Sequence, residues 1–339
     1  MVNTATPPAQ DAVKNPEVFL NFENNRYLID LCGEFDRNLA QIEAALSVQI
    51  LRRDNGLGVL GGADEQAKAS NILQYLYGRA ERGKSIEPAD IDAALRFLKE
   101  QKHDAQKPAD QIEMFKGGAL EIRTRKKTVE PRTVTQKKYV EDLMSKELVF
   151  GLGPAGTGKT YIAVAAAVSM FINGMVDKII LARPAVEAGE RLGFLPGDMK
   201  EKVDPYMQPL YDALNDFFPA KQVEKLIEDK RIEIAPLAFM RGRTLSNAYV
   251  VLDEAQNATT MQMKMFLTRM GEGSRMAITG DMSQIDLPRG VPSGLVEAEK
   301  VLRDVKGVAF TYFKAEDVVR HPMVAKIIIA YDKHSKNNG

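Results

Sequence analysis

A glycine-rich segment at residues 153–160, Gly-Pro-Ala-Gly-Thr-Gly-Lys-Thr, most strongly constrains how this 339-residue chain can fold. It lies between two apolar stretches, residues 148–152 and residues 160–171. A buried strand, a glycine-rich turn and a helix, in that order, are typical of a parallel α/β sheet. The glycines let backbone N–H groups converge on an anion, and the N-terminus of the helix adds a favourable dipole. The segment therefore predicts a phosphate-binding loop.

The residues of this loop have distinct expected roles. Lys159 is predicted to reach the β- and γ-phosphates of ATP and to be catalytic, and Thr160 is predicted to bind Mg²⁺. The predicted nucleotide-binding residues are those of the loop and the residue after it: Gly153, Pro154, Ala155, Gly156, Thr157, Gly158, Lys159, Thr160 and Tyr161. The alternative interpretation is a glycine turn that precedes a helix and binds nothing.

Two acids follow another apolar segment, residues 249–252. Carboxylates at the end of a buried strand are costly unless a cation lies beside them, and Mg²⁺ would supply that charge. Asp253 is predicted to hold the metal, and Glu254 to orient and deprotonate the attacking water. The alternative is a strand that runs into a helix, because a helix N-terminus also favours acids.

A third apolar segment, residues 275–279, is followed by Asp281 and Gln284. Parallel α/β sheets bind their ligands at the carboxyl ends of the strands, so both residues are candidate sensors of the γ-phosphate, and Gln284 is predicted to be catalytic. A polar loop without this role is the alternative.

Further strands are expected at residues 178–182 and 308–313, with a helical insertion between Pro184 and Arg243.

The pattern along the chain predicts several parts. They are a disordered tail at 1–16, a small α+β unit at 17–104, a basic connector at 105–132, the P-loop unit at 133–332 and a tail at 333–339. In the small unit, strands are expected at 18–22, 48–52 and 57–60, and helices at 27–46, 65–82 and 88–99. The basic run between Arg123 and Lys138 is either a solvated linker or an anion-binding stretch.

Composition limits the partners and the compartment. The formal net charge is 0, so no global field points to nucleic acid or to a membrane. The single cysteine, Cys32, cannot form an intramolecular disulfide, which suits a reducing compartment. The N-terminus lacks the features of a signal peptide, and the longest apolar stretch, residues 162–172, is too short to span a bilayer. A cytoplasmic protein without membrane association is expected.

Ordered motifs make the chain resemble a known family. Gln136, the phosphate loop, Val-Leu-Asp-Glu-Ala-Gln at 251–256 and Thr-Gly-Asp-x-x-Gln at 279–284 resemble the ATPase core of superfamily 1 helicases. The resemblance to PhoH-like proteins is more specific and spans about residues 130–332. It is carried by residues 182–197, by Arg241-Gly-Arg243-Thr, by Val319-Arg320-His-Pro and, in the N-terminal unit, by Leu31-Cys-Gly-Glu-Phe-Asp36.

The resemblance implies further roles. Gln136 is expected to read adenine, and the segment with Arg183 and Glu187 to link the nucleotide site to nucleic acid. Arg320 resembles an arginine finger that completes the site of a neighbouring subunit, with Arg243 as its rival. Members of the family are thought to form rings, so a homohexamer that acts with RNA is expected. The chain has one ATPase core rather than the two of a true helicase.

The N-terminal unit resembles a KH module, whose G-x-x-G loop clamps nucleotides. The matching residues here, Gly33-Glu-Phe-Asp36, lack the second glycine. RNA clamping and a role in assembly both remain open for this unit. The expected function is Mg²⁺-dependent ATP hydrolysis coupled to RNA binding or remodelling, with an RNA-processing protein as a further partner. The alternatives are a nucleotide-gated scaffold with little turnover and a small-molecule kinase.

Overall fold

The computed structural model describes residues 18–100, 120–184, 199–319 and 327. Two compact units divide the chain, Met1–Gly118 and Ala119–Gly339. The tails predicted at 1–16 and 333–339, and most of the predicted connector, lie outside the described residues. No helix in the described part is long and apolar enough to cross a membrane.

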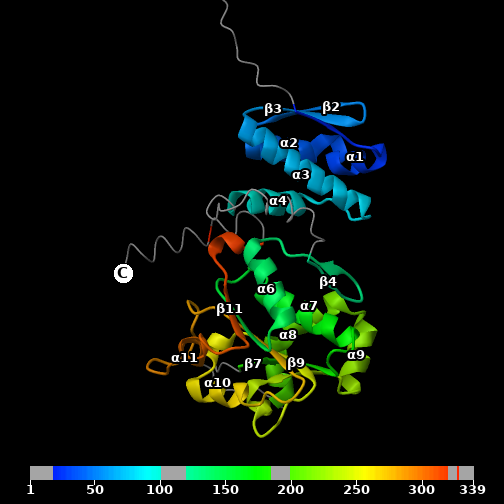
Figure 1. The fold of residues 1–339 in the computed structure, drawn as a ribbon. Coiled ribbons are helices and arrows are strands. Elements are labelled where there is room, and N and C mark those ends of the chain that lie inside the picture. The colour runs from blue at the N-terminus through cyan, green and yellow to red at the C-terminus, as the bar shows by residue number, and fades with distance from the viewer. Residues whose placement is uncertain (1–17, 101–119, 185–198, 320–326, 328–339) are drawn as a thin grey trace, which may run out of the picture. The chain divides into compact units, whose positions relative to one another are not determined.

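The first unit packs helices against a three-stranded antiparallel sheet (Figure 1). Its strands, in the spatial order β1-β3-β2, are β1 (Val18–Asn21), β2 (Gln49–Arg53) and β3 (Gly56–Leu60). Its helices are α1 (Asn25–Cys32), α2 (Arg37–Leu46), α3 (Ala63–Glu81) and α4 (Pro88–Glu100). The core consists of apolar side chains from both layers, among them Leu28, Leu31, Ile42, Leu57, Ile72 and Leu73. The Cys32 thiol lies in this core, and burial raises its pKa to about 11.

The predicted single helix at residues 27–46 was wrong, because the chain breaks at Gly33. Gly33 has φ 72°, and a 3-10 turn, η1 (Glu34–Asp36), separates α1 from α2. Phe35 and Asp36 also have positive φ, of 54° and 55°. The apolar spacing continues across the break because both helices bury a face in the same core. Residues 33–36 thus link two helices, and the Phe35 side chain is fully exposed.

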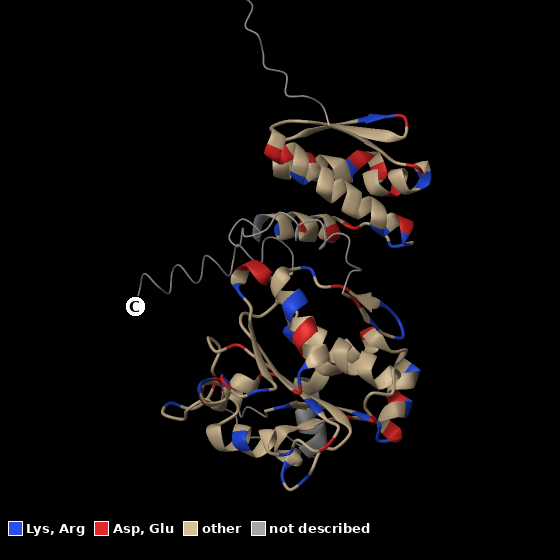
Figure 2. Ribbon diagram, in the orientation of Figure 1, with Lys and Arg blue, Asp and Glu red and all other residues tan. Residues whose placement is uncertain are grey.

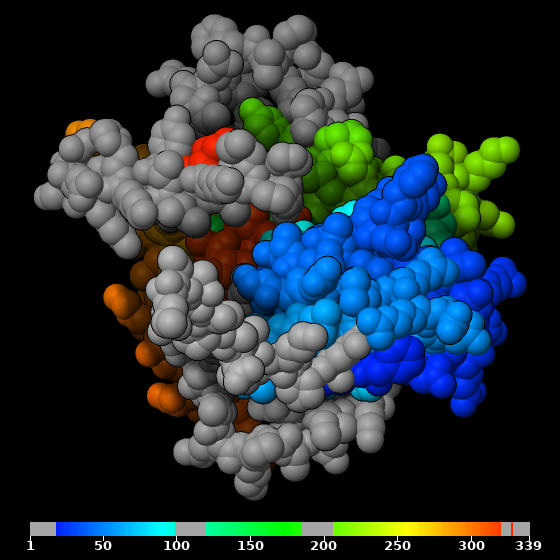
Figure 3. Space-filling model, turned by 90° about the horizontal axis from the view of Figure 1, so that it is seen from above, coloured from blue at the N-terminus to red at the C-terminus, as the bar shows by residue number. Residues whose placement is uncertain are grey.

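The central strand of this sheet, β3, carries two glycines. Gly56 and Gly58 lie on β3, and Phe19 of β1 pairs with Gly58. The Phe19 ring crosses Gly56 so closely that a Cβ there would lie 2.3 Å from Phe19 Cζ. Figure 3 looks onto this unit from the side of its sheet, in blue. A larger residue at position 56 would therefore displace the Phe19 ring from this position.

The second unit is built on a six-stranded parallel sheet, which confirms the predicted α/β class. The strands are β6 (Leu148–Leu152), β7 (Lys178–Arg183), β8 (Ile232–Pro236), β9 (Ala248–Leu252), β10 (Arg275–Gly280) and β11 (Val308–Tyr312). Their spatial order is β11-β6-β10-β9-β7-β8. The insertion between Pro184 and Arg243 is not purely helical as predicted, because it contributes β8. This strand was missed because Glu233 interrupts its apolar run and Pro236 ends it.

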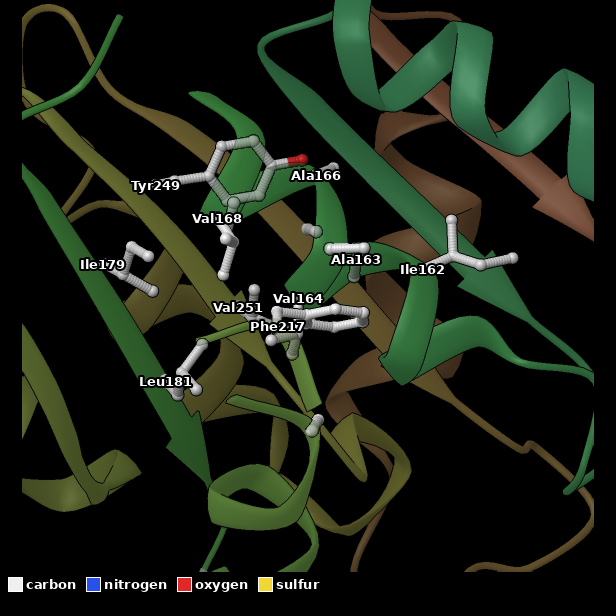
Figure 4. Close-up of a cluster of buried hydrophobic side chains, with 14 of the residues drawn as sticks. Ile162, Ala163, Val164, Ala166, Val168, Ile179, Leu181, Phe217, Tyr249 and Val251 are labelled. Carbon is white, nitrogen blue, oxygen red and sulfur yellow. The ribbon is translucent and has the colours of Figure 1, made fainter. Parts of the chain in front are cut away.

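Helices cover both faces of this sheet (Figure 1). They are α6 (Val134–Ser145), α7 (Lys159–Ile172), α8 (Met199–Phe217), α9 (Ala220–Glu228), α10 (Thr260–Leu267) and α11 (Gly294–Leu302). Along β9, Tyr249 and Val251 face a core shared with α7 and α8, whereas Val250 and Leu252 face a core shared with α10 and α11. Figure 4 shows the first of these cores, with Phe217 among the side chains of α7. Burial on both faces explains the uninterrupted apolar run before Asp253.

A short hairpin opens the second unit within the predicted connector. Its strands are β4 (Ile122–Arg123) and β5 (Thr128–Val129). Lys126 donates to the C-terminal end of α8, from its backbone N–H to Phe217 O (3.1 Å) and from Nζ to Asn215 O (2.7 Å). Lys127 forms a 2.6 Å ion pair with Asp216. These two cations satisfy free carbonyls and the negative end of the α8 dipole, so residues from 120 onward belong to the second unit.

Candidate nucleotide site

Three segments with polar side chains meet at one edge of the parallel sheet. The phosphate loop follows β6, Asp253 follows β9, and Thr279 and Asp281 lie at the end of β10. In the register, Gly280 pairs with Leu152 on one side of β10, and Ile278 pairs with Leu252 on the other. Because β10 lies between β6 and β9, these two strand ends are separated by two spacings, or about 10 Å. The site is thus assembled around β10.

The phosphate loop is wrapped around its own lysine. Lys159 is 8% exposed, and its Nζ donates to Gly153 O (2.6 Å) and Pro154 O (2.7 Å). Burial lowers the pKa of Lys159 below its ordinary value, although Asp281, Asp253 and Glu254 act in the opposite direction. Gly153, with φ 140°, lies so close to the backbone that a Cβ would be 2.3 Å from Phe313 O. Only glycine fits there.

Thr160, Asp253 and Thr279 form an oxygen cluster next to the loop. The Thr160 hydroxyl donates to Asp253 Oδ1 at 2.6 Å, and the Thr279 hydroxyl donates to the same oxygen at 2.8 Å. The two hydroxyl oxygens are 3.4 Å apart. Oxygen ligands of this kind suit Mg²⁺, which protein sites bind through one or two carboxylates together with substrate phosphates. Among the described residues, no group of three or more His, Cys, Asp or Glu is placed to hold a metal.

Glu254 lies beside this cluster in a strained backbone conformation. Its φ of 51° is in the left-handed region, which a non-glycine residue seldom adopts. One carboxylate oxygen lies 3.1 Å from Arg183 Nη2, and the other accepts from Gln256 Nε2 at 2.5 Å. Arg183 also donates to Tyr206 O on α8 at 2.7 Å. Arg183 and Gln256 thus hold the Glu254 carboxylate from two sides, and Arg183 is also hydrogen-bonded to α8.

Gln256 connects the end of β9 to the end of β10. It is 1% exposed, and its Oε1 accepts from the Asp281 backbone N–H at 3.0 Å. Asp281 in turn accepts from Gln284 Nε2 at 2.7 Å and from the Ser283 hydroxyl at 2.7 Å. Both predicted sensors, Asp281 and Gln284, therefore belong to one hydrogen-bonded group. From the sequence, Gln256 was only the fallback candidate for the base in place of Glu254, and its place in the Asp-Glu-Ala-Gln motif did not indicate that it joins the two strand ends.

Gln136 and Tyr161 lie on other sides of the loop. Gln136 is buried, donates from Nε2 to Thr157 O at 3.0 Å and accepts from the Arg132 N–H at 2.7 Å. It thus fastens the start of α6 to the phosphate loop. Tyr161 donates to Asp216 at 3.1 Å, and its ring lies 4.7 Å from that of Phe217, so its side chain is directed to α8.

The two candidate arginine fingers differ in what surrounds them. Arg320 lies outside the described residues, as does Glu187, but the N–H of Val319 donates to Gly156 O of the loop at 3.0 Å. Arg243 forms a two-pronged pair with Glu233, at 2.6 and 2.7 Å. Glu233 is on β8, four strand spacings or roughly 19 Å from β6. In its own chain, Arg243 is therefore held away from the phosphate loop.

Known proteins resemble this chain over most of its length. The PhoH-like protein family model matches residues 128–332. The PhoH-like protein of Bacillus subtilis is 48% identical over 326 residues, which cover 95% of this chain and 97% of that protein. The PhoH-like protein of Mycobacterium tuberculosis H37Rv is 44% identical over 310 residues, covering 91% and 86%.

Among solved structures, the UvsW helicase of bacteriophage T4 aligns with a TM-score of 0.34 and 15% identity, and the alignment covers 71% of this chain and 76% of the helicase. On the strength of the family model and the close relatives, the chain belongs to the PhoH-like protein family.

Proposed function

We propose that this PhoH-like protein hydrolyses ATP in the presence of Mg²⁺ and couples hydrolysis to RNA binding or remodelling. The observation that carries the proposal is the 2.6 Å hydrogen bond from Thr160 to Asp253, with Glu254 next in the chain. A hydroxyl from the phosphate loop and a carboxylate from a separate strand are thereby joined beside a buried lysine. This combination of groups is the one that phosphoryl transfer from a nucleotide needs.

Each residue of the site has a proposed task. The N–H groups of the loop and Lys159 bind the β- and γ-phosphates, and Gln136 holds the loop and reads adenine. Thr160 and Asp253 hold Mg²⁺, which neutralises charge on the phosphate oxygens when bound. Glu254 accepts the proton of the attacking water. Asp281 and Gln284, joined to Glu254 through Gln256, sense the γ-phosphate.

The assembly is also part of the proposal. We propose a six-membered ring in which Arg320 of one subunit completes the site of its neighbour, acting in the cytoplasm with RNA and an RNA-processing protein. The resemblance to PhoH-like proteins supports the ring and the RNA.

Phosphate release tests the proposed reaction. We expect release from ATP with Mg²⁺, its loss in excess chelator, and stimulation by RNA. Absence of release under all these conditions would favour the nucleotide-gated scaffold. Transfer of labelled phosphate to a small-molecule acceptor would favour the kinase. Glu254 argues against the kinase, because a general base beside the metal-binding pair is suited to activating water.

A further inference from the structure

Two neighbouring elements present exposed apolar and cationic side chains together. The first is η4 (Leu237–Met240) with the two residues after it, and the second is α10. We call their outer side the η4–α10 surface, defined by Phe239, Arg241, Met261 and Lys264. Phe239 is 51% exposed and Met261 is 81% exposed, although both are large apolar side chains. Such exposure on packed elements marks a binding surface when the residues cluster.

The scaffold beneath this surface is well packed. Leu237 and Met240 of η4 and Met263 and Phe266 of α10 are buried in one shared core. The segments that follow the two elements are also joined, because the Leu245 N–H donates to Arg269 O at 2.8 Å. The four outward side chains are therefore held in a constant arrangement by the buried ones.

Charge on this surface has one sign. Residues 234–252 and 255–271 contain no Asp or Glu, although the whole chain has equal numbers of acidic and basic residues. Figure 2 accordingly shows basic but no acidic residues on α10. Arg243 is neutralised by Glu233, and Arg269 donates to the carbonyls of Met265 and Arg243.

The two remaining cations are available to a ligand. Arg241 and Lys264 are exposed, and neither makes an ion pair with another described residue. Arg241 follows Phe239 by two residues in the chain, and Lys264 is on α10, which contacts η4. The surface thus offers an aromatic face and a flexible methionine together with two free positive charges.

We propose that the η4–α10 surface binds single-stranded nucleic acid, an inference that rests on the proposed coupling to RNA. The exposed aromatic ring of Phe239 offers a face on which an unpaired base stacks. Arg241 and Lys264 neutralise backbone phosphates on either side of that base. Met261 supplies an adaptable apolar contact. Absence of acids over both segments favours a polyanion over a protein partner.

The surface is connected to the nucleotide site through a short path. Helix α10 begins at Thr260, directly after the turn η5 (Ala255–Asn257), which itself follows Glu254. That turn is anchored, because the Ser293 hydroxyl donates to Gln256 O at 2.8 Å. A nucleic acid strand held on α10 therefore acts on the residues that hold Glu254, which is the link that coupling requires.

Binding is measured by fluorescence anisotropy with the full chain and labelled probes of about 16 nucleotides. The probes are a single-stranded RNA and the DNA of the same sequence. The variant is Phe239→Ala with Arg241→Gln and Lys264→Gln. Its matched control carries Met175→Ala, Lys221→Gln and Lys225→Gln, which remove another exposed apolar side chain and two other exposed cations elsewhere on the unit.

We expect the variant to bind either probe roughly 5- to 100-fold more weakly, because loss of one stacked base has an effect of this size. The salt dependence should also become shallower, by about 1.4 in the slope of log affinity against log salt, because two phosphate contacts are lost. The control should bind like the parent. Equal affinity of variant and parent overturns the inference, and so does a parent that binds neither probe. Neither result bears on ATP hydrolysis, which fails separately if the parent releases no phosphate with Mg²⁺.

Discussion

Thr160 and Asp253 are 93 residues apart in the sequence, and their side chains meet in a hydrogen bond of 2.6 Å. Thr279, on the strand between them, donates to the same carboxylate oxygen at 2.8 Å. Asp253 is therefore oriented by two hydroxyl groups, one at the start of helix α7 and one on strand β10. These two hydrogen bonds join the residue that follows the phosphate loop lysine to the acidic end of β9.

Replacing Lys159 with alanine should weaken ATP binding by about 10- to 100-fold, because a hydrogen bond to a charged group contributes roughly 1.5–3 kcal/mol. The measurement is titration with a fluorescent ATP analogue. Lys178→Ala, at an exposed lysine at the start of β7, is the control and should bind like the parent. Tight binding by the Lys159 variant would show that the loop does not hold the phosphates in the way proposed.

Glu254→Gln should bind ATP normally and hydrolyse it about 10²- to 10⁴-fold more slowly, because the amide keeps the size and loses the base. Steady-state phosphate release, with nucleotide binding measured in parallel, separates the two effects. Glu272→Gln changes an exposed glutamate outside the site and should leave turnover intact. Undiminished turnover in the Glu254 variant would remove this residue from the role of base.

Gln256→Ala should reduce both stability and turnover. The Asp281 N–H would lose its partner in a buried position, which costs about 1–3 kcal/mol, and Glu254 would lose one of its two holders. Urea unfolding measures the first effect and phosphate release the second. Gln262→Ala removes a glutamine that caps α10 on the exposed side, and it should lower stability without a comparable loss of turnover. Normal turnover by the Gln256 variant would separate this residue from catalysis.

Mixing Arg320→Ala with Glu254→Gln tests the proposed finger in trans. Some interfaces of mixed rings would contain an intact Glu254 site and an intact incoming Arg320, so activity should partly return. An arginine finger contributes about 10³–10⁵ in turnover, so each variant alone should be nearly inactive. Arg243→Ala is the control. The partly exposed ion pair of Arg243 with Glu233 contributes about 0–1 kcal/mol to stability, and this pair lies away from the phosphate loop of its own chain. If mixing restores nothing, the finger does not act between subunits.

Lys126→Gln with Lys127→Gln should shift the urea midpoint downward. Lys126 donates to α8, and the half-exposed pair of Lys127 with Asp216 adds only up to about 1 kcal/mol because solvent screens it. Arg125→Gln, in the same hairpin, should change stability by less than about 0.5 kcal/mol. An equal effect of both changes would contradict a fastening role for the hairpin.

Contact of Arg123, Arg125, Lys126 and Lys127 with RNA remains a prediction, to be measured separately by anisotropy.

The strands of the second unit were predictable because their signals are local. Where an apolar run is followed by glycine or by acids, as residues 148–152 are by Gly153, the following residue marks the end of the strand. β8 has weaker signals, since Glu233 interrupts it and Pro236 ends it. The break at Gly33 escaped prediction because the apolar period continues on both sides, and a positive φ at Phe35 leaves no trace in sequence.

Side-chain pairings at the site were beyond prediction for a different reason. The positions of Asp253 and Asp281 at strand ends follow from sequence, because parallel strands place their carboxyl ends together. The hydrogen bonds of Gln256 to Asp281 and of Gln136 to Thr157 depend on strand order and register, which no local pattern specifies. The pair of Arg183 with Glu254 likewise requires β7 to lie next to β9.

The β4–β5 hairpin, which is hydrogen-bonded to the end of α8, connects the incoming chain to the nucleotide site. The polypeptide enters this unit near Leu120, and the hairpin follows at once, fastened through Lys126 to the end of α8. Asp216 at that end binds both Lys127 and Tyr161, and Tyr161 is the next residue after Thr160. Tension on the chain that enters the unit would therefore reach the start of α7 through the bonds of Lys127 and Tyr161 to Asp216. The end of α8 therefore connects the chain that enters the unit with the start of α7, next to the threonine that hydrogen-bonds to Asp253.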